Sequence, residues 1–261
     1  MNRVSANVTH EHSLSGERLS LLAIFAHSED ESFGPAGTLA KYASEGIDVS
    51  LVAATRSHPV EVLDETSGRT RDRSCACRAV GIRRACLFDY QPGGLNQVDP
   101  AIIEERLVRL IRELRPQVIV TFAPAGLTGD TDNRMISAAA TAAFRDASDS
   151  SQFAQHLNEG LIAYAPQKLY YCVLPASLIT HWGVIGLNSV PDDQITAMLD
   201  VSAYGEMMKN ALYCQRHRAL DFIRWLTEDH RVEWNTEYYA LVESRLHKKP
   251  RREKDLFAGL R

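Results

Sequence analysis

The chain has 261 residues, of which 45% are hydrophobic and 24% are charged, and its formal net charge is −4. These values are typical of a globular protein that buries its own core, and the lack of a basic surplus argues against nucleic-acid binding. The apolar runs are shorter than the ~18 residues that a membrane span needs, and residues 1–18 lack the apolar stretch of a secretory signal, so we expect a cytoplasmic protein whose partners are small molecules.

Strand and helix patterns alternate from residue 19 onward. Short, mostly apolar runs are typical of parallel strands buried on both faces, and they occur at 19–26, 48–54, 85–90, 117–122 and 168–174. Helical patterns lie between and after them, at 35–46, 70–80, 100–115, 132–144 and 201–226. This alternation predicts an α/β fold, namely a Rossmann-like three-layer α/β/α domain with a mostly parallel sheet.

A single domain accounts for most of the chain. We expect a flexible N-terminal tail over 1–18, the α/β domain over 19–245, and a basic, solvated C-terminal tail over 246–261. The five cysteines are odd in number and irregularly spaced, which is not the pattern of a disulfide framework. We therefore expect them to be small, mostly buried hydrophobic residues.

Two polar clusters, 27–31 and 129–134, each follow a predicted strand. Ligands of open α/β sheets bind beyond the carboxyl ends of the strands, so both clusters suit a binding crevice. His27 and Asp30 suit coordination of a divalent metal, and a neighbouring carboxylate would accept a proton from water that such a metal acidifies. The alternative is that residues 29–31 only cap the following helix, whose N-terminus favours negative charge.

Residues 26–31 read AHSEDE, and residues 122–134 read FAPAGLTGDTDNR. These segments resemble, in order, the AHPDDE and FGPDGLTGHPDHR motifs of the LmbE/PIG-L family. Further similar segments lie at 70–81, 195–202 and 209–218, so the resemblance covers most of the predicted domain. Members of this family are metal-dependent hydrolases, mostly zinc enzymes, that remove acyl groups from N-acetyl sugars and related amides. The resemblance therefore implies an N-deacetylase on a Rossmann-like fold.

The resemblance also implies roles for individual residues. The family's signature His and second Asp hold zinc, which makes His27 and Asp30 the expected metal ligands. Glu29 stands in place of the Asp that acts as general base, with its carboxylate displaced by one methylene; a displacement of about 1 Å costs ~10²-fold in rate. Arg71 matches the Arg that contacts the substrate.

The second motif departs from the family. Asn133 occupies the position of the third zinc ligand, a His, and an amide oxygen is a weak zinc ligand. Asp130 occupies the position of a catalytic His thought to stabilise the oxyanion, where a carboxylate repels developing negative charge. Asp132 is retained, and either supports a ligand or substitutes for one. Gln215 aligns with a late active-site His of the family.

Three interpretations stay open. The first is an active N-deacetylase with zinc. The second is a different metal-assisted enzyme, in which an oxygen-rich set of ligands suits manganese, iron or magnesium better than zinc. The third is a non-catalytic homologue without metal that binds a small molecule or a partner. The sequence does not distinguish a monomer from a homo-oligomer.

Other residues carry weaker signals. Trp182, with His181, is a candidate for lining the substrate cleft, and His58 for its rim; ordinary packing is the alternative for each. Four aromatic residues of the last third suit the core or an interface: Trp225, Trp234, Tyr238 and Tyr239.

Overall fold

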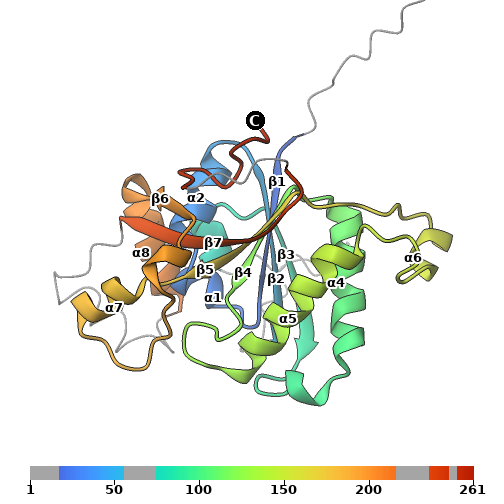
Figure 1. Cartoon of the computed structure of the whole chain (residues 1–261), viewed down its shortest axis with the longest axis horizontal. Coiled ribbons are helices and arrows are strands. Elements are labelled where there is room, and N and C mark those ends of the chain that lie inside the picture. The colour runs from blue at the N-terminus through green and yellow to red at the C-terminus, as the bar shows by residue number, and fades with distance from the viewer. Residues whose placement is uncertain (1–17, 56–74, 216–234, 247–251) are drawn as a thin grey trace, which may run out of the picture.

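The computed structural model describes residues 18–55, 75–215, 235–246 and 252–261 (Figure 1). The strands within these residues are β1 (Ser20–Phe25), β2 (Asp48–Thr55), β3 (Arg84–Tyr90), β4 (Val118–Phe122), β5 (Lys168–Val173), β6 (Ala197–Asp200) and β7 (Thr236–Ser244). The α-helices are α1 (Asp30–Phe33), α2 (Ala36–Ser44), α3 (Cys75–Ala79), α4 (Pro100–Leu114), α5 (Thr131–Asp146), α6 (Gln155–Asn158), α7 (Ala176–Trp182) and α8 (Gly205–Cys214). Each of the five predicted strands is present, as β1 to β5.

The described strands form one sheet in the order β3-β2-β1-β4-β5-β7-β6. The strands from β3 to β5 in this order are parallel, whereas β7 pairs antiparallel with both β5 and β6. The prediction of a mostly parallel sheet is therefore confirmed, and an antiparallel pair extends its edge. Strands are added in one direction from β1 to β3 and in the other from β4 onward. The switch point between β1 and β4 is where sheets of this kind form their ligand crevice.

Helices cover both faces of the sheet and bury two cores. Alternate side chains of a strand face opposite sides, so Phe25 of β1 lies in one core and Ile24 in the other. Leu39 of α2 packs in the first core, and Ile111 of α4 and Phe144 of α5 pack in the second. Figure 1 shows α4 and α5 on one side of the sheet and α2 and α8 on the other, which confirms the predicted three layers.

The C-terminal segment 252–261 is not the solvated tail that its basic composition predicts. Leu256 and Phe257 are fully buried and belong to the first core. Glu253 forms a buried ion pair with Lys168 of β5, and the pairing offsets part of the free energy needed to remove both charges from water. This segment is therefore part of the folded domain.

The cysteines also differ from expectation. Cys75, which begins α3, and Cys214, which ends α8, form a disulfide with their Cα atoms 5.6 Å apart and a sequence separation of 139. The remaining cysteines are free: Cys77 and Cys172 are buried and Cys86 is partly buried. The expectation of five unpaired, buried residues was therefore wrong for two of them.

None of the helices within the described residues is long and apolar enough to span a membrane. Several predicted features lie outside the described residues and have no structural outcome: the tail over 1–17, His58, Arg71, Trp225, Trp234 and residues 216–226 of the last predicted helix.

Candidate functional site

The candidate site lies beyond the carboxyl ends of β1 and β4. His27 follows β1, and the loop 123–130 leads from β4 to α5. This loop turns sharply at Gly126 and Gly129, whose φ angles of 62° and 79° favour glycine. The turns bring Asp130 back to the first strand, so that its Oδ1 lies 3.4 Å from Nε2 of His27.

Thr55, the last residue of β2, orients the imidazole of His27. Oγ1 of Thr55 lies 2.7 Å from Nδ1 of His27, and it donates a hydrogen bond of 3.0 Å to the carbonyl oxygen of Ala26. Because a hydroxyl has one proton to donate, Oγ1 accepts its second hydrogen bond from a protonated Nδ1. In the neutral ring the lone pair is therefore on Nε2, which faces Asp130.

The first turn of α5 holds Asp130 and Asp132. Asp130 is the N-cap, and its Oδ1 accepts hydrogen bonds from the backbone N–H groups of Asp132 at 2.8 Å and Asn133 at 3.2 Å. Asp132 is fully buried, and its two oxygens accept hydrogen bonds from the N–H groups of Gly93 at 2.6 Å and Leu95 at 3.0 Å. Backbone donors thus hold both carboxylates in place.

Three donor atoms, one each from His27, Asp130 and Asp132, lie within 4.8 Å of one another. Two donor atoms that each lie about 2.0–2.1 Å from a tetrahedral zinc are about 3.3 Å apart. The 3.4 Å between Nε2 of His27 and Oδ1 of Asp130 therefore suits a shared ion. Any two of the three donor atoms that are farther apart would have to move closer when the ion binds. Oδ1 of Asn133, the residue after Asp132, is buried and has no hydrogen-bond partner among the described residues. By this chemistry the residues fit a divalent metal.

Asp30, the second ligand that the family resemblance implies, is not a member of this group. Its Oδ2 accepts a hydrogen bond of 2.9 Å from the backbone N–H of His27 and so closes the turn between β1 and α1. Burial raises the pKa of Asp30 to about 7, although the hydrogen bond from the His27 backbone acts in the opposite direction. Asp30 therefore supports the backbone of His27.

Glu29 and Glu31 are buried on either side of Asp30. Glu29 accepts a hydrogen bond of 3.2 Å from Oγ of Ser28 and makes no side-chain cap to α1, which weighs against helix capping as its only role. Burial raises the pKa of Glu31 to about 8, and its Oε2 has no hydrogen-bond partner within the described residues. Nε2 of Gln215 lies 3.5 Å from Oε1 of Glu31, so the end of α8 reaches this turn.

The sequence does not reveal Thr55, Gly93 or Leu95 as parts of the site. A hydroxyl at the end of the apolar run 48–54 is a usable signal for Thr55, but only once β2 is known to lie beside β1. The contributions of Gly93 and Leu95 come from backbone N–H groups, which every residue except proline carries.

The open α/β sheet defines a Rossmann-like protein, and one histidine and two carboxylates lie at the switch point of this sheet. Ligands of such folds bind at this point, so the class is a Rossmann-like protein with a candidate metal site. Residues 22–144 match the family model described as PIG-L: GlcNAc-PI de-N-acetylase. This matched segment contains both motifs that resemble the family, at 26–31 and 122–134.

Two named relatives are similar to this chain in sequence, and one solved structure is similar in fold. The chain is 26% identical to 1D-myo-inositol 2-acetamido-2-deoxy-alpha-D-glucopyranoside deacetylase of Kineococcus radiotolerans, over 92% of this chain and 82% of that protein. It is 28% identical to mycothiol S-conjugate amidase of Streptomyces coelicolor, over 94% of this chain and 98% of that protein. The fold is similar to N,N'-diacetylchitobiose deacetylase from Pyrococcus horikoshii, with a TM-score of 0.62, 16% identity, and coverage of 85% of this chain and 83% of that one.

Proposed function

We propose that this protein is a metal-dependent amide hydrolase that removes an acyl group from an N-acylated sugar or another small amide. The observation that carries the proposal is the cluster of three donor atoms from His27, Asp130 and Asp132 within 4.8 Å of one another, in which Nε2 of His27 lies 3.4 Å from Oδ1 of Asp130. If the imidazole of His27 is neutral, its Nε2 and the carboxylate oxygen of Asp130 are both hydrogen-bond acceptors and repel each other. Either a bound cation between them or a second proton on the imidazole removes this repulsion. The similarity to a deacetylase of an acetamido sugar and to an amidase supports amide cleavage.

His27, Asp130 and Asp132 would hold the metal, and Oδ1 of Asn133 is available as a further, weaker donor. When bound, a divalent metal lowers the pKa of water and polarises a carbonyl group. The family resemblance suggests zinc, whereas one imidazole with two carboxylates is also a suitable donor set for manganese or iron. Asp30 takes the role of holding the His27 backbone, in place of the ligand role that the motif implies.

Glu29 is the proposed proton carrier. It is 6% exposed and lies two residues from His27, so its carboxylate is largely shielded from bulk water. In the proposed hydrolysis a water oxygen bonds to the carbonyl carbon, Glu29 accepts the water proton, and the C–N bond breaks as that proton passes to the departing amine. The products are a carboxylic acid and an amine. Arg71 is proposed, from its match to the family motif, to hold the substrate.

One observation favours a second candidate, a homologue that binds ligands without catalysis. Both oxygens of Asp132 and one of Asp130 already accept hydrogen bonds from backbone N–H groups. These carboxylates therefore have a structural role that does not depend on metal. Catalysis needs them to serve a cation as well, which a carboxylate with about four lone-pair sites can do.

Metal content and amide cleavage test the proposal together. The protein is purified without added metal, analysed for zinc, manganese and iron, and assayed for amine release from N-acetylglucosamine. We expect about one metal per chain, lost in His27→Ala and kept in His181→Ala, a matched control at an exposed position on α7. Glu29→Gln should keep the metal and lose at least 10²-fold in kcat. A protein that takes up no metal even after incubation with all three ions would refute the hydrolase proposal.

A further inference from the structure

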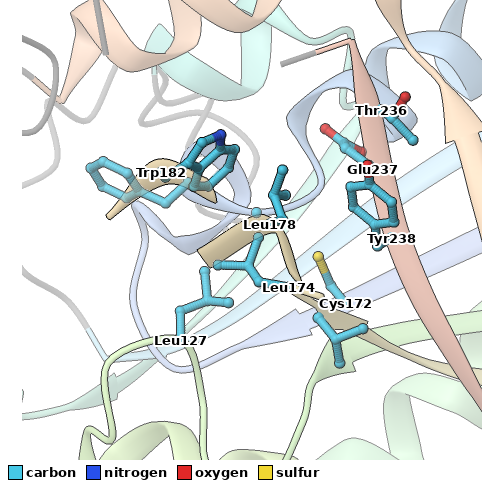
Figure 2. A pocket seen from close by; sticks show the side chains of 11 residues that line it. Leu127, Cys172, Leu174, Leu178, Trp182, Thr236, Glu237 and Tyr238 are labelled. Atoms are coloured by element: carbon cyan, nitrogen blue, oxygen red, sulfur yellow. The ribbon is translucent and has the colours of Figure 1, made fainter. Parts of the chain in front are cut away.

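A pocket beside the candidate site is lined by side chains from distant parts of the chain. Its wall includes Phe33, Leu127, Leu174, Leu178, Trp182 and Tyr238, and it spans about 410 Å³ when space open to solvent is counted. Figure 2 shows the labelled side chains of α7, β7 and the loop after β4 arranged around this space. Like most small-molecule sites, it is lined mainly by apolar and aromatic side chains. Trp182, a candidate for lining the substrate cleft, lies in the wall of this pocket, whereas His181 does not.

The polar groups in the wall do not offer a free charge to a ligand. Glu237 accepts hydrogen bonds from the N–H groups of Gly37 at 2.7 Å and Thr38 at 2.9 Å, one on each carboxylate oxygen. Its Oε2 also accepts a hydrogen bond of 3.1 Å from the hydroxyl of Tyr239. Burial raises the pKa of the Cys172 thiol well above its usual range, so this group is neutral. The pocket therefore suits a hydrocarbon group better than a sugar or an ion.

The pocket and the candidate metal site share two structural elements. Leu127 lies on the same loop as Asp130, and Phe33 lies at the end of the short helix α1 that Asp30 begins. Asn188 fastens the chain after α7 to this loop, because its N–H donates to the carbonyl of Leu127 at 2.7 Å and its Nδ2 to that of Ala125 at 2.8 Å. The loop after β4 and the short helix after β1 therefore contribute residues both to the candidate site and to the pocket wall.

We infer that this pocket binds the acyl part of the substrate, and that the preferred substrate is an amide of an acyl group longer than acetyl, such as a hexanoyl or an aryl-acyl group. The inference rests on the proposed function. The amine part of the proposed substrate is a sugar or another polar group, which gains less from an apolar wall than an alkyl or aryl chain does. The acyl chain is the part that gains by leaving water, by about fourfold in affinity per buried methylene.

Calorimetric titration of the full-length protein tests this inference through binding, without requiring turnover. The probes are N-acetylglucosamine, N-hexanoylglucosamine and the hexyl glycoside of N-acetylglucosamine, which carries its alkyl chain on the sugar. Because hexanoyl adds four methylenes to acetyl, we expect N-hexanoylglucosamine to bind at least tenfold more tightly than N-acetylglucosamine. A gain of twofold or less, or a gain for the hexyl glycoside alone, would overturn the inference.

Two variants of α7 test whether the preference for N-hexanoylglucosamine arises in this pocket. Leu178→Gln places an amide in the pocket wall and should remove most of the hexanoyl preference. Ile179→Gln is the matched control, because Ile179 is also partly buried on α7 but does not line the pocket; it should keep the preference. Equal loss in both variants would contradict the assignment of the pocket.

Turnover separates this inference from the proposed function. Tighter hexanoyl binding without any amine release by the metal-loaded protein would keep the pocket and refute the hydrolase. Cleavage of both N-acyl sugars with equal kcat/KM and equal affinity would keep the hydrolase and refute the pocket assignment.

Discussion

Replacing Thr55 by valine removes the hydroxyl that orients His27 while nearly preserving side-chain shape. Oγ1 of Thr55 donates to Ala26 and accepts from Nδ1 of His27 at 2.7 Å, which leaves Nε2 as the metal-binding atom. Loss of a hydrogen-bond partner that orients a ligating histidine typically lowers metal affinity 10–100-fold, or about 1.4–2.7 kcal/mol. We therefore expect Thr55→Val to bind zinc or manganese 10–100-fold more weakly than the wild type.

Competition with a chromogenic chelator, starting from metal-free protein, measures this change. Thr55→Ser keeps the hydroxyl and should bind metal within about threefold of the wild type. Thr55→Val also removes one of the two hydrogen bonds to the buried carbonyl of Ala26, which keeps the bond from the backbone N–H of residue 55. This loss costs about 0.5–1.5 kcal/mol, so circular dichroism at the assay temperature must first establish that the variant is folded. Nitrogen NMR of the imidazole gives a second readout. The reasoning is wrong if Thr55→Val binds metal as the wild type does, or if neutral His27 carries its proton on Nε2.

Three further changes test the fold around the site. Lys168→Met leaves the buried carboxylate of Glu253 without its ion-pair partner and should lower the free energy of unfolding, measured by urea titration, by about 3–5 kcal/mol. Adding Glu253→Leu should recover most of this loss. An unchanged free energy of unfolding in the single variant would contradict the buried ion pair. Reduction of the Cys75–Cys214 disulfide, which spans 139 positions, should cost up to about 5 kcal/mol and lower Tm, whereas a Cys214→Ser protein should not respond to reductant. The pKa of Glu31 is 4.5 in the unfolded chain and about 8 in the folded protein. Its contribution to stability is therefore full below about pH 4.5 and is lost as the pH rises toward 8. Glu31→Gln should flatten the fall in Tm between pH 5 and 8, and identical Tm profiles of variant and wild type would refute the raised pKa.

Much of the sheet could be predicted because its signals are local. The strands that become β1, β2, β4 and β5 are buried on both faces, so each appears in the sequence as a short apolar run. β7 was not predicted, because most of its residues are only partly buried and it therefore lacks a continuous apolar run. The expectation that aromatic residues of this segment belong to the core or an interface still holds for Tyr239, which is fully buried in the core.

Long-range partners explain the errors at the C-terminus and among the cysteines. A basic segment is normally solvated, yet residues 252–261 pack against the sheet because Lys168 on β5 neutralises Glu253. Cys75 and Cys214 meet only because α3 and α8 pack together on one face of the sheet. Neither pairing leaves a trace in spacing or composition.

At the candidate site the sequence by itself determined which segments carry the chemistry, because 27–31 and 129–134 are polar clusters that follow strands ending at the same edge. The tertiary structure alone decided which atoms of these segments come together. His27 approaches Asp130 and Asp132, whereas Asp30 is engaged by the His27 backbone. The physical reason is that a motif specifies residue types along the chain, while metal coordination depends on the positions and lone pairs of atoms, which the turns at Gly126 and Gly129 and the hydroxyl of Thr55 arrange.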